Sequence, residues 1–403
     1  MKILVLNSGS SSQKSSLFEI NENLPDEPPA PLWEGKIEWK DDVADVEVKD
    51  SHGAARKDKV RVSSRAEAVQ HLLSTLWDGK TQAVASPGDI DVVGHRVVHG
   101  GPKFKQPTRL TSGVKSGIAE ASAFAPLHNR AELEGMEIIG KLLGPVPQVA
   151  VFDTGFHRTI PPAAAIYPGP YQWFESGIHR YGFHGINHQY CAGRAAQLLG
   201  RELSSLKLVT CHLGNGCSLA AIRGGESVDT TMGFTPLEGL MMGTRSGSID
   251  AGILTYLLRV GQIKPQEIDD LLNKKSGLLG VSEISEDMRE ILAAMQKGND
   301  RAKLAFDIYV HRLQAGIGAM VAALGGIDAL VFTAGVGENS AEVRAAACGQ
   351  LGFLGLKLDA AANARSPRDS DIASSDLAVR VLIIRAQEDW AIAGDCWRLM
   401  RQS

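Results

Sequence analysis

The chain has 403 residues, of which 44% are hydrophobic and 22% are charged, and its formal net charge is −4. This balance is typical of a soluble globular protein, and at about 100–200 residues per domain it predicts two domains. Because there is no excess of positive charge, a groove for nucleic acid is not expected, although a few arginines can still form a local anion site.

Five cysteines stand at irregular spacings and form no CxxC pair. In a chain of this length the pattern indicates reduced thiols, not a disulfide framework or a zinc site. The first apolar run, residues 3–6, is too short for a signal peptide or a membrane span. We therefore expect a cytoplasmic protein without a membrane segment.

Short apolar runs followed by glycine-rich turns recur along the chain, at residues 3–12, 206–216 and 329–339. A strand followed by such a turn brings backbone N–H groups close to phosphates in α/β proteins. The first two turns are each followed by a second strand-like run, at 15–20 and 218–222. This weak internal repeat predicts two similar α/β halves that hold a nucleotide.

Apolar residues at helical spacing predict the helices. Their expected bounds are 64–76, 131–143, 187–199, 251–260, 265–273 and 302–324. The proline-rich residues 25–31 and the small, polar residues 360–371 predict loops.

Residues 6–14, LNSGSSSQK, offer hydroxyl, amide and ammonium donors to a phosphate, but they lack the glycine that precedes lysine in a Walker A loop. A serine-rich hairpin turn explains them equally well. Residues 94–101, GHRVVHGG, place Arg96 among small residues. The planar fork of arginine suits a carboxylate or phosphate, and the alternative is a salt bridge beside core histidines.

Residues 151–157, VFDTGFH, place Asp153 at the end of an apolar run, where α/β sheets gather their ligands. The alternative is an aspartate that caps the next turn. In RYGFHGINH, His184 and His188 stand four residues apart, but the catalytic glutamate of a zinc HExxH motif is absent. A hydrogen bond from His184 to an anion is the better interpretation.

Residues 243–250, GTRSGSID, carry Arg245 between small residues just before a predicted helix. Such an arginine suits phosphoryl transfer, where charge on the transferred group must be neutralised, and the alternative is a solvated loop arginine. Taken together, these motifs favour ATP-dependent phosphoryl transfer to a small anion.

The same stretches resemble the acetate kinase family, within the superfamily of acetate and sugar kinases, chaperone ATPases and actin. The resemblance runs over nearly the whole chain and also includes PLHN, HLGNG, TPLEGLMMGTRSG, SEDMR and FTAGVGENS. It implies an α/β fold with two ribonuclease H-like (actin-like ATPase) domains and a nucleotide-binding cleft between them. The implied limits are 1–154 with 386–403, and 155–385. It also implies a homodimer.

The resemblance implies roles for the matching residues. Asp153, His184 and Arg245 match catalytic residues, of which the last two steady the transferred phosphoryl group. Asn7 and Glu388 match the pair at the magnesium site, with Mn²⁺ as an alternative ion.

Two further sets follow from the resemblance. The substrate set, in which Arg96 holds the carboxylate, comprises Arg96, Val98, Leu127, His128 and Pro236. The set that holds ATP or ADP comprises Lys14, His212, Leu213, Gly214, Asn215, Gly216, Asp287, Met288, Arg289, Gly335, Val336, Gly337, Glu338 and Asn339.

The chain departs from the family pattern near several of these positions. The departures are Gln13, Ser16, Ser248, Ala251, Glu283, Ala386 and Gln387. Glu283 stands where the family has glycine, and Ser248 stands where it has aspartate. None replaces a residue that is assigned to the chemistry.

The expected reaction is the reversible phosphorylation of acetate to acetyl phosphate by ATP and Mg²⁺, by direct in-line transfer. Because acetate is already a carboxylate at neutral pH, the enzyme needs no general base, and Asp153 is expected to orient Mg²⁺ or an arginine. A propionate or other short-chain acyl kinase is the first alternative. An actin- or chaperone-like ATPase is the second, and the carboxylate-binding arginine speaks against it.

Overall fold

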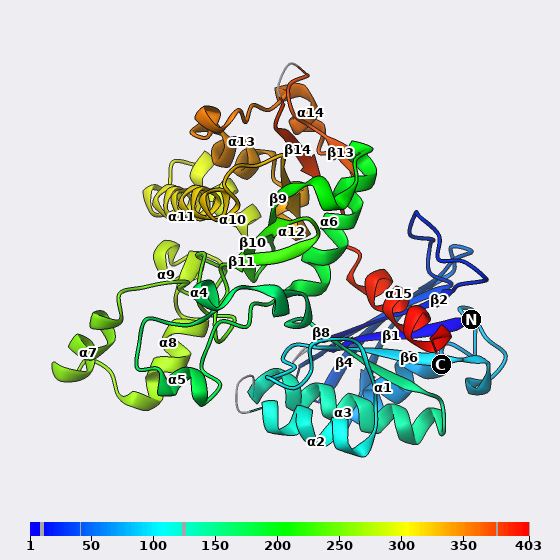
Figure 1. Cartoon of the computed structure of the whole chain (residues 1–403). Helices are drawn as coiled ribbons and strands as arrows, with labels where there is room; N and C mark the ends of the chain where they lie inside the picture. Colours follow the sequence, from blue (N-terminus) through cyan, green and yellow to red (C-terminus); the bar gives the residue numbers. More distant parts are fainter. Residues whose placement is uncertain (9–11, 41, 123–125, 376–377, 403) are drawn as a thin grey trace. The chain divides into compact units, whose positions relative to one another are not determined.

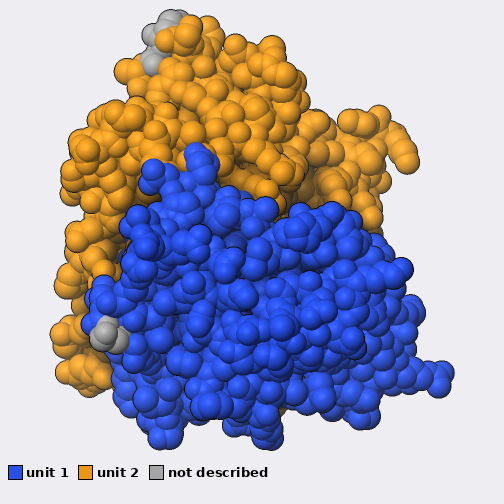
Figure 2. All heavy atoms as spheres, turned by 90° about the vertical axis from the view of Figure 1, so that its right-hand side faces the viewer, with its two compact units in different colours: residues 1–156, 387–403 blue, residues 157–386 orange. Residues whose placement is uncertain are grey.

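The computed structural model describes residues 1–8, 12–40, 42–122, 126–375 and 378–402. They form two compact units, coloured separately in Figure 2. Unit 1 comprises residues 1–156 and 387–403, and unit 2 comprises residues 157–386. The domain limits inferred from the resemblance remain a prediction.

Unit 1 is built on a sheet with the strand order β5-β4-β3-β2-β1-β6-β8-β7. Its strands are β1 Lys2–Ser8, β2 Ser12–Glu19, β3 Trp33–Lys40, β4 Val43–Asp50, β5 Ala55–Arg61, β6 Val92–Val97, β7 Thr108–Arg109 and β8 Gln148–Phe152. Strand β1 pairs antiparallel with β2 and parallel with β6, and β6 pairs parallel with β8. The predicted strands at 3–6 and 15–20 are confirmed.

Helices cover both faces of this sheet (Figure 1). They are α1 Arg65–Ser74, α2 Ser112–Ala121, α3 Pro126–Leu143 and α15 Glu388–Arg401. Leu4 and Leu6 of β1 share a core with residues of α1 and α3. On the opposite face, a Cβ at Gly94 would lie 2.7 Å from the side chains of Ile392 and Cys396. Only glycine therefore lets α15 pack so closely on β6.

Unit 2 contains a second sheet with the order β11-β10-β9-β12-β14-β13. Its strands are β9 Lys207–Leu213, β10 Cys217–Arg223, β11 Glu226–Thr230, β12 Ala329–Thr333, β13 Ser370–Asp371 and β14 Arg380–Ile383. Strands β9 and β10 form a hairpin, and β12 pairs parallel with both β9 and β14. Both sheets thus place two parallel strands beside the hairpin formed around a glycine-rich turn, which confirms the predicted internal repeat.

The helices of unit 2 are α4 Pro162–Ala165, α5 Gln172–Glu175, α6 Gly185–Leu199, α7 Ala251–Arg259, α8 Ile268–Lys274, α9 Gly277–Ser282, α10 Met288–Gln296, α11 Asp300–Leu324, α12 Ala334–Asn339, α13 Ala341–Gly349 and α14 Ala360–Arg365. Helices α6 and α11 lie on opposite faces of the sheet (Figure 1). Asn299 caps α11 by accepting a hydrogen bond from the N–H of Ala302, and Gly325 ends the helix at φ 64°. None of the described helices has the length and apolar character needed to cross a membrane.

The predicted helices are confirmed, with two differences. Helix α3 begins at Pro126, before its expected start at 131, and residues 265–273 divide into the 3₁₀ turn Pro265–Glu267 and α8. The predicted loop at 360–371 is wrong, because α14 forms where Asp359 accepts a hydrogen bond from the N–H of Ala362. Residues 334–339, expected to form a turn, instead form the short helix α12.

Candidate active site

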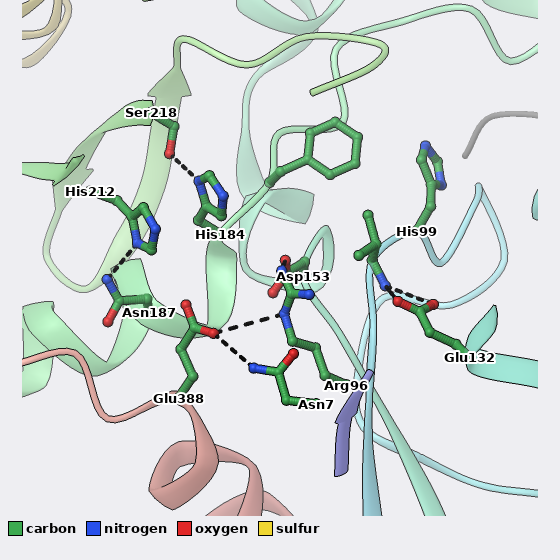
Figure 3. A network of polar contacts seen from close by, with 12 residues as sticks. Asn7, Arg96, His99, Glu132, Asp153, His184, Asn187, His212, Ser218 and Glu388 are labelled. Atoms are coloured by element: carbon green, nitrogen blue, oxygen red, sulfur yellow. Dashed lines mark hydrogen bonds and ion pairs between the residues drawn. The ribbon is translucent and has the colours of Figure 1, made fainter. Parts of the chain in front are cut away.

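A largely buried arginine surrounded by carboxylates lies at the ends of the parallel strands of unit 1. Arg96 near the end of β6 donates through Nη2 to Oδ2 of Asp153, which follows β8 (Figure 3). Asp153 is only 1% exposed, and Nε of Arg96 lies 3.9 Å from Oε2 of Glu388. Burial alone would lower the pKa of Arg96, but the nearby carboxylates raise it above its ordinary value. The guanidinium is therefore permanently charged and already oriented.

Asn7 and Glu388, the predicted metal pair, lie beside this arginine. Nδ2 of Asn7 donates to Oε2 of Glu388 over 3.3 Å, which brings an amide and a carboxylate together (Figure 3). The described residues contain no cluster of three or more His, Cys, Asp or Glu side chains that could hold a metal by itself. One carboxylate and one amide oxygen still fit Mg²⁺, which keeps several waters and shares its coordination with substrate phosphates.

Glu132 of α3 is a member of this cluster that the sequence did not reveal. Both of its carboxylate oxygens lie 3.2 Å from the backbone N–H of Val98, and the residue is 2% exposed. Burial raises the pKa of Glu132 to about 8, although the charge of Arg96 and the N–H of Val98 favour its ionised form. In the sequence of an amphipathic helix, a buried glutamate cannot be distinguished from an exposed one.

We expect Glu132→Gln to flatten the pH dependence of stability in unit 1. Between the ordinary pKa of 4.5 and about 8, folded Glu132 keeps a proton that the unfolded chain has released. The free energy of unfolding of the parent therefore falls as the pH rises through this window, by up to about 1.4 kcal/mol per pH unit. In urea unfolding at pH 5 to 9, the free energy of unfolding of Glu132→Gln relative to that of the parent should therefore rise with pH by the same amount per pH unit. A constant difference between the two proteins would contradict the raised pKa.

The other predicted residues of unit 1 are more scattered. Lys14 is exposed on β2 and lines a separate cavity of 370 Å³ with Ser16 and Asp389. The side chain of Val98 is buried. Leu127 and His128 lie in the first turn of α3, and their side chains fall outside the described part of the chain.

In unit 2, the predicted catalytic residues His184 and Arg245 converge on Gly216. A Cβ at Gly216 would lie 3.4 Å from Nε2 of His184 and 3.5 Å from Nη2 of Arg245. The ring of His184 stacks on that of His212 with centroids 4.0 Å apart. Nη1 of Arg245 donates to the carbonyl of Pro236 over 2.7 Å, and burial lowers the pKa of Arg245. Two donors thus face the space over one glycine.

The backbone of His184 supports a functional role. His184 adopts φ 56°, a left-handed conformation that non-glycine residues rarely take, at the start of α6. Such strain persists only where the surrounding structure holds it, and it concentrates at functional sites.

We expect Gly216→Ala to fold normally and to lose activity. The new methyl group would make ordinary contacts at 3.4 Å or more with its three nearest neighbours, so the backbone need not move. It would occupy the space between the two donors, and kcat should fall roughly 10-fold because the reacting group is displaced. Gly193→Ala, where a Cβ meets nothing within 4 Å, is the matched control. Unchanged kcat in the Gly216 variant would contradict this placement.

Three stretches predicted to hold the nucleotide converge on one cavity of 970 Å³ in unit 2. The predicted residues that line it are Gly214, Asn215, Asp287, Met288, Arg289, Gly335, Val336 and Asn339. The remaining members of these stretches, His212, Leu213, Gly216, Gly337 and Glu338, are not among its lining residues. Helix α10, which was not predicted, adds Leu292, Ala293 and Gln296.

Arg344 of α13 is a buried residue that supports this cavity. It is 0% exposed, and its Nη1 donates to the carbonyls of Gly337 and Glu338 over 2.8 and 2.9 Å. Its Nη2 donates to the carbonyl of Asn363 over 2.9 Å, and burial lowers its pKa to about 10. Arg344 therefore satisfies carbonyls near the end of α12, where the helix itself provides no donors.

The zinc alternative for His184 and His188 has no support. Both ring nitrogens of His188 are hydrogen-bonded, to Thr210 and Ser218, and Nδ1 of His184 also contacts Ser218. All five cysteines are buried thiols without disulfides, as expected.

The model of the acetokinase family matches residues 2–394. This chain belongs to the acetokinase family. The acetate kinase of Cyanothece sp. is 60% identical to it over 403 residues, covering 100% of this chain and 99% of that protein. The acetate kinase of Nostoc punctiforme is 59% identical and covers 100% of both chains.

Solved structures agree with this family assignment. The crystal structure of Porphyromonas gingivalis acetate kinase matches with a TM-score of 0.91 at 40% identity over 99% of each chain. A propionate kinase from Francisella tularensis matches with a TM-score of 0.88 at 36% identity over 98% of each chain. The α/β class and the two-domain actin-like fold expected from the sequence are confirmed.

Three of the residues that depart from the family pattern form hydrogen bonds or an ion pair with neighbouring residues. Glu283 adopts φ 57° at the end of α9, which explains why glycine suits this position, and forms an exposed ion pair with Arg301. Oγ of Ser248 accepts a hydrogen bond from the N–H of Gly239 over 3.0 Å. Oγ of Ser16 donates to Oδ2 of Asp389 over 2.7 Å. None of the contacts described for these three side chains involves His184, Arg245 or Arg96.

Proposed function

We propose that this protein is an acetate kinase that transfers a phosphoryl group reversibly between ATP and acetate. The observation that carries the proposal is the match to proteins named acetate kinase along the whole chain, at up to 60% identity. The motif residues that the resemblance assigns to the chemistry are all present.

The acceptor is proposed to bind at Arg96. Its bond to Asp153 leaves the guanidinium fixed in direction, so that one acetate oxygen is aimed at the γ-phosphorus. An O–P bond then forms as the bond between the γ-phosphorus and the bridging oxygen of ADP breaks. No proton is transferred, because acetate is ionised at neutral pH, and Asp153 serves as a positioning residue rather than a base.

His184 and Arg245 are proposed to neutralise charge on the phosphoryl group during its transfer. Their Nε2 and Nη2 atoms are the donors that converge over Gly216. Hydrogen-bond donors that are held in place before the reaction stabilise developing charge without further rearrangement. The nucleotide would occupy the 970 Å³ cavity lined by Gly214, Asp287 and Gly335.

Asn7 and Glu388 are the residues proposed to hold Mg²⁺, with Mn²⁺ as an alternative. A divalent ion bound there supplies charge neutralisation at the phosphates. Glu388→Gln keeps the hydrogen-bond acceptor for Asn7 and removes the negative charge. It should raise the Mg²⁺ concentration needed for half-maximal activity, and an unchanged Mg²⁺ dependence would contradict this assignment.

The test of the function is acyl phosphate formation from ATP, trapped with hydroxylamine, with formate, acetate, propionate and butyrate. The proposal predicts Mg²⁺-dependent product with the highest kcat/KM for acetate. Hydrolysis of ATP without any acyl phosphate would instead support the actin-like ATPase alternative.

A propionate kinase is the second candidate, supported by the match to the Francisella tularensis enzyme. One methylene in an apolar pocket is worth only about 1–3 kcal/mol, so small changes in pocket shape decide between the two acids. A higher kcat/KM for propionate than for acetate would favour this candidate.

We propose a cytoplasmic homodimer on the basis of the family resemblance. Light scattering on the purified protein should give a molecular mass twice the 43.1 kDa of one chain. A monomer of full activity would contradict the dimer.

A further inference from the structure

A row of hydrogen bonds runs through the sheet of unit 2 and ends at His184. Oγ1 of Thr210 in β9 lies 2.7 Å from Nδ1 of His188, and Nε2 of His188 lies 2.8 Å from Oγ of Ser218 in β10. The same Oγ lies 2.9 Å from Nδ1 of His184, as Figure 3 shows. We call Thr210, His188 and Ser218 the histidine relay.

The relay is shielded from solvent. Thr210, His188 and Ser218 are each 0% exposed, and all three lie on the face of the sheet that α6 covers. His188 lies in the first turn of α6, four residues after the N-cap residue His184, and both imidazoles reach Oγ of Ser218. In such a site each hydroxyl proton needs an acceptor, because an unsatisfied buried donor is costly.

The available partners determine the direction of each bond. Within the described part of the chain, the hydroxyl of Thr210 has no polar partner except Nδ1 of His188. It must donate there, and burial keeps His188 neutral by lowering its pKa far below the ordinary value, so the ring proton of His188 is on Nε2. That proton is donated to Ser218.

The hydroxyl proton of Ser218 then has one possible acceptor among the described residues. Its hydroxyl contacts His188 and His184 only, among the described residues, and it already accepts from His188. Its proton must therefore be donated to Nδ1 of His184. An imidazole that accepts at Nδ1 carries its own proton on Nε2.

We propose that the histidine relay fixes the tautomer of His184, so that its Nε2–H donor points to the transferred phosphoryl group. Nε2 of His184 is the atom beside Gly216 and Arg245. In the opposite tautomer this atom would present a lone pair to phosphate oxygens and repel them. Thr210, His188 and Ser218 are thus positioning residues, a role that rests on the proposed function for its catalytic consequence.

Thr210→Val is the sharpest test, because valine matches the shape of threonine and lacks the hydroxyl. Without that donor, His188 is free to take its proton on Nδ1 and accept from Ser218 at Nε2. The direction of the remaining hydrogen bonds is then no longer fixed, so that Ser218 can accept from His184 as well as donate to it, and both tautomers of His184 become populated. We expect kcat to fall about 2- to 10-fold with little change in KM for acetate, because only the tautomer with its proton on Nε2 can donate to the phosphoryl group. Thr210→Ser keeps the hydroxyl and should restore kcat.

The tautomer itself is measured by long-range ¹H–¹⁵N NMR on the full chain labelled with ¹⁵N-histidine, with His184→Gln used to assign the signal. The parent and Thr210→Ser should show His184 protonated on Nε2, and Thr210→Val should show a mixture of Nε2 and Nδ1 protonation. Ser218→Ala serves as a second variant and should release the preference for Nε2. A parent in which Nδ1 carries the proton would overturn the relay, as would an unchanged tautomer in both Thr210→Val and Ser218→Ala. An Nε2 proton in a protein that phosphorylates no acid would uphold the relay and reject the proposed function instead.

Discussion

Arg245→Ala should lower kcat by about 10²–10³ and change KM for acetate far less, because the guanidinium acts on charge that develops during phosphoryl transfer. The side chain makes one described hydrogen bond to the protein, to the carbonyl of Pro236, so its removal should leave the fold intact. Steady-state kinetics with acetate and ATP varied separately provide the measurement.

Two further variants make this result specific. Arg312→Ala removes an exposed arginine from α11 and should behave like the parent. Arg245→Lys keeps the charge and loses the planar fork, so its kcat should fall between those of the parent and the alanine variant. An increase in KM for acetate at constant kcat would show that Arg245 binds the acid in the ground state, which would contradict the role proposed here.

The sequence predicted the framework of this site because the framework is local. A strand, a glycine-rich turn and a second strand are adjacent in the chain, and both hairpins, β1–β2 and β9–β10, formed where the pattern placed them. The family motifs then named Arg96, His184 and Arg245 in loops or at strand ends. The sequence identifies these positions because glycine and other small residues surround them.

The supporting residues were not predictable, because their significance lies in burial and in partners distant along the chain. Glu132 and Arg344 are charged residues in helices, where exposure is the usual expectation, yet they are 2% and 0% exposed. Thr210 and Ser218 look like ordinary polar residues in strands. Helix α14 differs from its expected loop for another reason: small side chains are common in loops, but here three alanines, which favour helix, follow a capping aspartate.

Removing Arg96 should harm stability as well as acetate binding, which the sequence alone did not suggest. Asp153 is 1% exposed and Arg96 is 15% exposed, so Arg96→Met would leave a buried carboxylate without its cation. Breaking a buried pair in this way costs about 3–5 kcal/mol. Replacing both charges, in Arg96→Met/Asp153→Asn, should recover most of that loss while the enzyme stays inactive.

Tryptophan fluorescence can follow this change in unit 1 specifically. Five of the six tryptophans lie in unit 1, and Trp173→Phe removes the one in unit 2. In this background, urea unfolding of the parent, the single variants and the double variant forms a complete cycle. Equal stabilities for Arg96→Met and the parent would show that the ion pair does not stabilise the fold. Activity of Asp153→Asn that recovers at raised pH would show that Asp153 acts as a base instead of orienting Arg96.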